Sequence, residues 1–194
     1  MGFTRHELES FRDATVPDLI GADTRLLFVG INPGLWTAAT RTHFAHPSNR
    51  FYRALWLAGI VDREVDPSAG MTYTDREHFL ARGLGITNLV ARATAKASEL
   101  SVDELRAGGR DLRQRITAMD VRAVAVAGLT AYRAAFEQRR AVAGRQPADL
   151  MGVPTWVVPN PSGLNAHETA ESLALAYREP AEFAGILLSA PRGI

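Results

Sequence analysis

The chain has 194 residues, 46% hydrophobic and 22% charged, and its 22 basic and 21 acidic side chains leave a formal charge of +1 at pH 7. This length and composition are typical of one globular domain with its own core. The absence of cysteine excludes disulfides, iron–sulfur clusters and thiolate metal sites. No apolar run approaches the roughly 18 residues of a membrane span, and residues 1–14 carry acids where a signal peptide is apolar. We therefore expect a cytoplasmic protein without a membrane partner.

The charged residues are distributed unevenly along the chain. No acidic residue lies between Asp23 and Asp62. That interval contains four arginines: Arg25, Arg41, Arg50 and Arg53. Apart from Lys96, every basic residue is an arginine, whose planar guanidinium pairs with two phosphate oxygens at once. The near-zero net charge argues against strong nucleic-acid binding, whereas the acid-free interval fits either one DNA-facing surface or ordinary solvated faces.

Short apolar runs rich in β-branched residues alternate with helical patterns along the chain. The runs predict four buried strands, at residues 24–31, 85–90, 121–128 and 153–159. Helical patterns cover residues 50–57 and 130–138, and Ser101 with Glu104 has the form of a capping box that begins another helix. This alternation predicts a three-layer α/β/α sandwich with a short, mainly parallel central sheet of about four strands.

The carboxyl-terminal part of the chain is predicted to contain one last helix. Asn165 with Glu168 repeats the capping-box form and predicts that this helix begins at Asn165, and Pro180 is expected to end it. The apolar segment 183–188 is expected either to pack back on the body or to form a contact surface.

No internal repeat and no long linker divides the chain. We therefore expect a single domain over residues 1–194. Its core spans about residues 24–178, with flanking segments at 1–23 and 179–194.

Two loops are predicted to lie where ligands bind in a parallel α/β sheet, at the carboxyl ends of the strands. One is residues 30–35 after the first strand, and the other is residues 160–165 after the last. Each contains Asn-Pro followed closely by glycine, which gives a rigid turn with exposed backbone amides and a carboxamide held at a fixed angle. One such turn is ordinary loop chemistry, but two at the same edge of a sheet indicate a site. The first loop has neither the pattern of a P-loop nor that of a dinucleotide-binding loop, so we expect no nucleotide cofactor.

These loops belong to a series of segments that closely resembles the mismatch-specific uracil and thymine DNA glycosylases of the uracil-DNA glycosylase superfamily. The segments are GINPGL at 30–35, HFAHP at 43–47, NRF at 49–51, TNLVAR at 87–92, ELRAGG at 104–109 and NPSGL at 160–164. Their order and spacing agree with that family from about Leu26 to Tyr177.

The resemblance implies a uracil-DNA glycosylase-like fold and a monofunctional enzyme that flips and excises uracil from G·U pairs in double-stranded DNA, initiating base excision repair. Related damaged bases such as ethenocytosine are within its expected range. The implied partner is double-stranded DNA with a mismatched or damaged base, and we expect a monomer with no cofactor and no metal. Two alternatives stay open: a mismatch-recognising DNA-binding module with little turnover, and a hydrolase of free nucleosides.

The same resemblance implies roles for residues around the first loop. Asn32 matches the catalytic asparagine that positions the attacking water. Because Asn32 cannot deprotonate that water, breaking of the glycosidic bond should run ahead of water attack. Gly30 and Ile31 are expected to contact the flipped base, Ile31 through its backbone. Phe44 matches a ring that stacks on the base; the alternative is that Phe44 is simply a core residue.

Two further residues are expected to contact the base. Thr37 should crowd a 5-methyl group and so favour uracil over thymine. Asn160 stands where other branches of the superfamily carry a histidine that donates to the departing base, so we expect weaker stabilisation of the leaving group and modest turnover.

The second loop is expected to contact DNA. Gly163 and Leu164 match a wedge that fills the space left by the flipped nucleotide. The remaining predicted DNA contacts are Ser162, Asn165, His167 and Arg50. Ala166 stands where some relatives carry an arginine, and His167 either substitutes for it or is simply exposed.

Some other residues near the site also need an interpretation. Trp36 is expected to line the rim of the base pocket or to lie on DNA. Ala91 lacks an acid that some relatives carry near this loop, which removes one possible water-activating carboxylate. His43 and His46 lie three residues apart, but no third ligand is close in sequence, so we reject a metal site.

Overall fold

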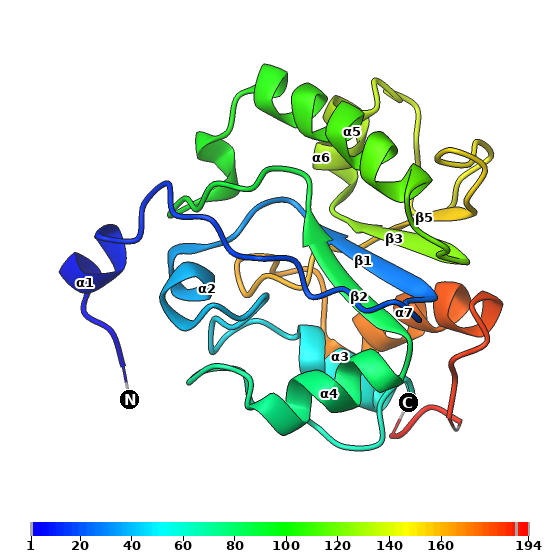
Figure 1. Ribbon diagram of the computed structural model, residues 1–194, viewed down its shortest axis with the longest axis horizontal. Coiled ribbons are helices and arrows are strands. Elements are labelled where there is room, and N and C mark those ends of the chain that lie inside the picture. The colour runs from blue at the N-terminus through cyan, green and yellow to red at the C-terminus, as the bar shows by residue number, and fades with distance from the viewer. Residues whose placement is uncertain (1, 189, 194) are drawn as a thin grey trace.

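A five-stranded sheet runs through the middle of the molecule in the order β2-β1-β3-β5-β4 (Figure 1). The computed structural model describes residues 2–188 and 190–193. The strands are β1 (Leu26–Gly30), β2 (Leu84–Asn88), β3 (Ala123–Ala127), β4 (Gly144–Arg145) and β5 (Thr155–Val158). Neighbours among β2, β1, β3 and β5 are parallel, and β4 is an antiparallel edge strand. The predicted parallel sheet of four strands is therefore confirmed, with a short fifth strand added at one edge.

Helices cover both faces of this sheet, as Figure 1 shows. One face carries α3 (Phe51–Leu57), α4 (Tyr73–Ala81) and α7 (Ala170–Phe183), and the other carries α5 (Val102–Thr117) and α6 (Leu129–Ala135). The shorter elements are α1 (Arg5–Glu9), α2 (Leu35–Thr40) and a 3₁₀ turn at Ala97–Glu99. None of the helices in the described part of the chain has both the length and the apolar character needed to cross a membrane.

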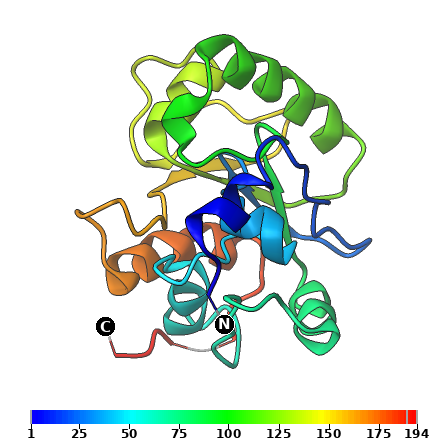
Figure 2. The ribbon, with the colours of Figure 1, turned by 90° about the vertical axis from the view of Figure 1, so that its left-hand side faces the viewer.

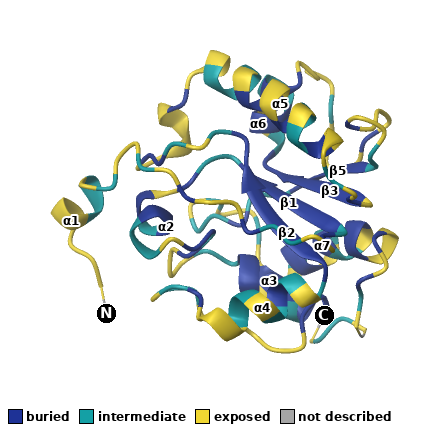
Figure 3. Ribbon diagram, in the orientation of Figure 1, coloured by how far each residue is buried: buried dark blue, intermediate teal, exposed yellow. Residues whose placement is uncertain are grey.

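The strands supply both halves of a two-sided core. Leu26 and Phe28 of β1 pack in the cluster that contains α3 and α7, whereas Leu27 and Val29 pack with α5 and α6. The alternation follows from the pleat, which sends successive side chains to opposite faces. Since both faces are covered, the four parallel strands are buried along their length (Figure 3), and this is why they read as nearly continuous apolar runs.

The start of α5 follows the predicted capping box, but the start of α7 does not follow its prediction. Glu104 N donates to Ser101 Oγ at 3.2 Å, as expected. The predicted start of the last helix at Asn165 is wrong, because α7 begins at Ala170 with Thr169 as its cap. The Asn165 side chain is already used in the preceding loop, where its Nδ2 donates to Asn160 O at 3.1 Å.

The prediction that Pro180 ends the last helix is also wrong. The helix continues to Phe183, and its final turn is buried: Pro180 is buried, and Ala181 packs in the core cluster that includes residues of β3 and β5. Burial of this turn compensates for the one backbone hydrogen bond that proline cannot donate. The following segment packs back on the body, since Ile186 is buried and Leu188 N donates to Gly59 O at 2.9 Å.

Candidate active site

The loops that follow β1 and β2 run together at the carboxyl edge of the sheet. Leu89 N donates to Gly30 O at 2.9 Å, Val90 N to Ile31 O at 3.0 Å and Thr94 N to Pro33 O at 3.1 Å. Figure 2 shows this side of the molecule, with α1 and α2 in front. The two loops therefore form one hydrogen-bonded layer in which the side chain of Asn32 is held.

The carboxamide of Asn32 has a fixed orientation. Its Nδ2 donates to the backbone oxygen of Arg92 at 3.0 Å and to Thr94 Oγ1 at 2.8 Å, with a longer contact of 3.2 Å to Pro33 O. A backbone carbonyl only accepts, so the atom that faces Arg92 O must be the nitrogen. The Thr94 hydroxyl donates to Lys96 O at 2.9 Å, so its lone pair is free to accept from Asn32. Asn32 Oδ1 has no hydrogen-bond partner among residues 2–188 and 190–193, and Asn32 therefore presents an acceptor.

Asn160, in the loop after β5, has the opposite arrangement. Its Oδ1 accepts from Ser162 N at 3.1 Å, which closes a tight turn. In the described part of the chain its Nδ2 has no hydrogen-bond partner, so Asn160 presents donors. A β-carbon at Gly128 would lie 3.3 Å from Ile31 Cδ1 and 3.9 Å from Asn160 Cβ, which brings the loops after β1 and β5 together at that point.

Phe44 lies between the core and the site. Its ring stacks on Phe51 with centroids 4.2 Å apart and packs against the core cluster that contains α3. The ring is also close to Gly30, where a β-carbon would lie 3.2 Å from Phe44 Cζ. The backbone of Phe44 has φ +56, a conformation that costs an aromatic residue on the order of 1–3 kcal/mol and is typical of functional sites. Phe44 thus packs against the core and also lies beside the loop that carries Asn32. Its stacking on a base stays a prediction.

Asn88 is a site residue that the motifs did not single out. It ends β2 with only 8% of its surface exposed, and its Nδ2 donates to His43 Nδ1 at 3.2 Å. His43 Nε2 in turn donates to Pro17 O at 3.0 Å, which fixes the tautomer and leaves Nδ1 as an acceptor. Burial lowers the pKa of His43, so the ring is neutral at pH 7. The sequence did contain a signal for Asn88, because it is a polar residue near the carboxyl end of a run predicted to be a buried strand.

The free oxygen of Asn88 faces Gly30, the first residue of the loop that carries Asn32. A β-carbon at Gly30 would overlap Asn88 Oδ1, so only glycine allows this approach. Among the described residues Asn88 Oδ1 has no hydrogen-bond partner. Gly30, Phe44 and Asn88 therefore meet beside the loop that carries Asn32.

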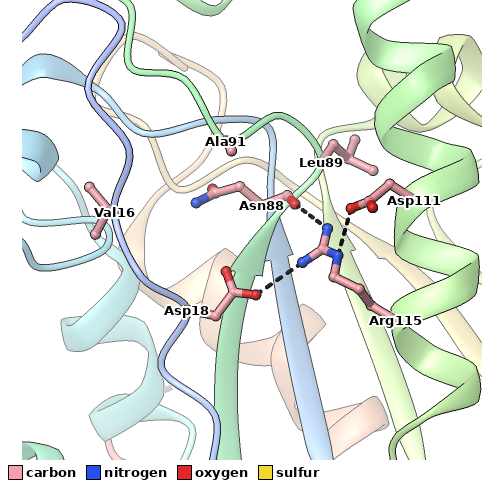
Figure 4. A pocket seen from close by; sticks show the side chains of 7 residues that line it. All are labelled: Val16, Asp18, Asn88, Leu89, Ala91, Asp111 and Arg115. Carbon is pink, nitrogen blue, oxygen red and sulfur yellow. Dashed lines mark hydrogen bonds and ion pairs between the residues drawn. The ribbon is translucent and has the colours of Figure 1, made fainter.

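A cavity of about 290 Å³ lies beside the end of β2, between the amino-terminal segment and α5 (Figure 4). Its lining residues are Val16, Asp18, Asn88, Leu89, Ala91, Asp111 and Arg115. Arg115 donates to Asn88 O at 2.9 Å and pairs with Asp18 at 3.0 Å and Asp111 at 2.8 Å. Figure 4 shows the Asn88 side chain pointing away from this guanidinium. Arg115 thus tethers the backbone at the end of β2 and has its own charge neutralised.

The loop after β5 holds Leu164 out toward solvent. Leu164 is 83% exposed. Arg50 Nη1 donates to Ser162 O at 3.3 Å and Asn165 O at 3.2 Å, and a β-carbon at Gly163 would overlap Ser48. The loop is therefore clamped against residues 48–50, and this gives Arg50 a structural contact in addition to its predicted one with DNA.

The remaining predicted residues lie around this centre. Thr37 is buried in α2, and Trp36 donates its indole N–H to Ser68 O at 2.9 Å with its ring edge on His46. His167 is exposed, and its backbone N donates to Asn165 Oδ1 at 3.4 Å. The DNA contacts of these side chains stay predictions.

Comparisons with known proteins agree with the fold and the motifs. The sequence model described as the Uracil DNA glycosylase superfamily matches residues 17–183. The structure is similar to the solution NMR structure of a "putative Uracil DNA glycosylase" from Methanosarcina acetivorans, with a TM-score of 0.59 and 18% sequence identity. That similarity covers 85% of this chain and 96% of the other, and it confirms the predicted fold class.

Proposed function

Because the chain belongs to the uracil DNA glycosylase superfamily and is thus a hydrolase of N-glycosidic bonds in DNA, we propose that its substrate is uracil in G·U mismatches of double-stranded DNA. The observation that carries this proposal is the opposite polarity of two carboxamides at one sheet edge. Asn32 presents an acceptor and Asn160 presents donors. Hydrolysis of a deoxyuridine needs both, one for the incoming water and one for the departing base.

Asn32 acts on the water. Its Oδ1 accepts a hydrogen bond from a water molecule and aims the oxygen of that water at C1′ of the deoxyribose. A neutral amide does not take up a proton, so it cannot generate hydroxide. The C1′–N1 bond therefore breaks first, with its electron pair leaving on uracil N1. The water then adds to the cationic sugar and loses a proton, which passes through solvent to the uracil anion, giving free uracil and an abasic site. Positioning supplies most of the rate in such a step.

Asn160 acts on the leaving group. As the bond breaks, negative charge develops on uracil and spreads to its carbonyl oxygens. A donor held at that place stabilises the charge without any reorganisation at the moment of reaction. A neutral amide is a weaker donor than a charged group, which supports modest turnover.

Asn88 and Phe44 fit the recognition of an extruded uracil. Asn88 Oδ1 is an acceptor because His43 uses the amide nitrogen, and an acceptor pairs with the N3–H of uracil. Cytosine carries a bare N3 and would face that oxygen with a second acceptor. Flipping the base costs a few kcal/mol, less for a mispaired base, and the exposed Leu164 is placed to fill the vacated stack.

Thr37 bears on the choice between uracil and thymine. We infer that its β-branched side chain crowds a 5-methyl group, so G·U duplexes should be processed faster than G·T duplexes. Replacing Thr37 with alanine should raise excision of thymine by about 10- to 200-fold and leave uracil excision nearly unchanged, since one methylene-sized group is worth roughly 1–3 kcal/mol of discrimination. Equal wild-type rates on G·U and G·T would contradict this role.

One assay tests the proposed function. An end-labelled duplex with a single G·U pair is incubated with the protein, and abasic sites are then cleaved with alkali. We expect cleavage at the uracil by the wild type and by Gln114→Ala, an exposed change on α5, and loss of cleavage in Asn32→Ala. Selective binding of the G·U duplex without any cleavage would assign a recognition module instead. Release of uracil from free deoxyuridine but not from DNA would assign a nucleoside hydrolase.

A further inference from the structure

Residues 3–16, here called the N-terminal arm, lie outside the part of the chain that matches the superfamily, which begins at residue 17. We propose that the N-terminal arm is a positioning element that fixes Asn32 in its productive orientation through the segment 92–94. The inference rests on the proposed role of Asn32 in positioning water. Figure 2 shows the arm and its helix α1 on the same side of the molecule as α2, which directly follows the loop that carries Asn32.

A small apolar cluster joins the arm to the two loops that flank Asn32. It is separate from the two clusters that cover the faces of the sheet. The arm supplies Leu8, Phe11, Ala14 and Val16, and the rest of the chain supplies Leu35, Ala38 and Ala93. Leu35 and Ala38 belong to α2, which follows the catalytic loop directly, and Ala93 lies between the two residues that accept from Asn32. Without the arm, these three buried side chains lose four of the apolar side chains that pack in their cluster.

Polar contacts fix the arm to the same segment. Asp13 N donates to Ala93 O at 3.0 Å, and Ala93 N donates to Ala14 O at 2.9 Å. The Arg92 guanidinium pairs with Asp13 at 3.1 Å and with Glu104 at 2.6 Å. Hydrogen bonds from Arg92 and then from Ser101 lower the pKa of Glu104 to about 2, so the Glu104 carboxylate stays charged at neutral pH.

Further contacts tie the arm to its surroundings on either side of this point. Arg12 pairs with Glu99 in the turn that follows segment 92–94. At the other end, the Phe3 ring packs edge-on against Trp36 of α2, with centroids 5.0 Å apart.

These contacts matter because segment 92–94 determines where the Asn32 amide points. Both of its strong acceptors, Arg92 O and Thr94 Oγ1, lie in that segment. A side chain that positions water must be held to within about 0.5 Å, and a misplacement of about 1 Å costs roughly 100-fold in rate. No hydrogen bond joins the arm to Asn32 among the described residues, so its effect is transmitted through the position of these two acceptors.

The first test removes residues 2–14 and measures single-turnover excision from the G·U duplex over a range of enzyme concentrations. We expect the rate at saturation to fall about 10- to 100-fold while the half-saturating concentration stays within about twofold. Arg5→Ala, an exposed change within the arm, is the matched control and should behave as wild type. A change confined to half-saturation would assign the arm to DNA binding and overturn the inference.

A double-mutant comparison separates an effect of the arm on the position of Asn32 from a general destabilisation of the fold. The deletion is repeated in an Asn32→Ala background with 5-fluorouracil opposite guanine, because that base leaves more readily and keeps slow rates measurable. If the arm acts through Asn32, the deletion should cause no further loss in this background. Equal losses in both backgrounds would overturn the inference.

A second readout does not depend on activity. The two side-chain amide protons of Asn32 are identified by NMR from their absence in Asn32→Ala, and their exchange with solvent is measured. Exchange should be faster in the deletion, and also in Asp13→Asn, which keeps a residue that tolerates φ +62 but removes the charge paired with Arg92. If the deletion unfolds, Asp13→Asn and Phe11→Ala decide the matter. Unchanged exchange in these variants overturns the inference even if the wild type excises no uracil, whereas inactivity of the wild type bears on the proposed function alone.

Discussion

The chain uses Asn-Pro twice at one edge of its sheet and turns the two carboxamides in opposite senses. After β1, the amide nitrogen of Asn32 donates to Arg92 O and Thr94 Oγ1, so the oxygen is left free. After β5, the side-chain oxygen of Asn160 accepts from Ser162 N, so the nitrogen is left free. The same dipeptide therefore gives an acceptor in one loop and donors in the other, because its neighbours differ. The variants below are expected to affect the two loops differently, from the largest effect to the smallest.

The largest effect is expected at Asn32. Asn32→Ala should reduce the single-turnover rate on G·U duplexes at least about 100-fold, and Thr94→Val, which keeps the shape but removes the acceptor, about 10-fold. Binding of the duplex should change little in either variant. The two losses should not add in the double variant, because Thr94 acts only through Asn32. Additive losses would show that Thr94 has another role.

A loss of about 10-fold is expected in Asn160→Ala, because the departing uracil loses a donor. This loss should shrink with 5-fluorouracil, whose anion needs less stabilisation, whereas the loss in Asn32→Ala should persist with either base. The comparison of the two substrates thus separates help to the leaving group from positioning of water. Equal sensitivity of both variants to the leaving base would contradict the assignment of separate roles.

Leu164 tests whether the second loop also acts as a wedge. Leu164→Ala should slow excision from G·U duplexes about fivefold, within the range expected when a side chain that replaces a stacked base is lost. Excision of uracil from single-stranded DNA should be unaffected, because no stack has to be refilled. Leu175→Ala, at an exposed position on α7, is the control. A similar loss on both forms of DNA would assign Leu164 to folding of the loop.

A third carboxamide, that of Asn88, owes its polarity to a buried histidine, and the expected effect here is on stability. Burial lowers the pKa of His43 below its usual 6.5, so on acidification the unfolded chain takes up this proton before the folded one does. The free energy of unfolding should therefore fall as the pH drops below about 6.5 and be unaffected by His43 above it. Thermal melting between pH 5 and 8 measures this, with His43→Asn as the comparison. A wild-type slope that His43→Asn leaves unchanged would place its origin in other groups.

The strands could be predicted from the sequence because their surroundings leave a direct trace in it. A strand covered on both faces is apolar along nearly its whole length, and residues 26–31 and 123–128 meet that demand. The predicted meeting of the two Asn-Pro loops also follows from local information, since parallel strands all end at the same edge.

The predictions failed where a tertiary contact competes with a local pattern. Asn165 has the right spacing for a helix cap, but its side chain is bonded to Asn160 O, and Thr169 caps α7 instead. Pro180 lies inside the helix because the core buries the turn that follows it. Asn88 was missed because its role depends on His43 and Gly30, both more than 40 residues away in the sequence.

The sequence by itself determined the alternation of strands and helices, the edge at which the two loops meet and the family to which the chain belongs. Which end of the Asn32 carboxamide is free was decided only by the tertiary structure, whereas Asn160 takes its orientation from Ser162, two residues along the chain. An amide has donors and an acceptor at nearly the same distance from the backbone, so its residue name says nothing about which of them is available. For Asn32 the answer comes from Arg92 and Thr94, some 60 residues further along the chain.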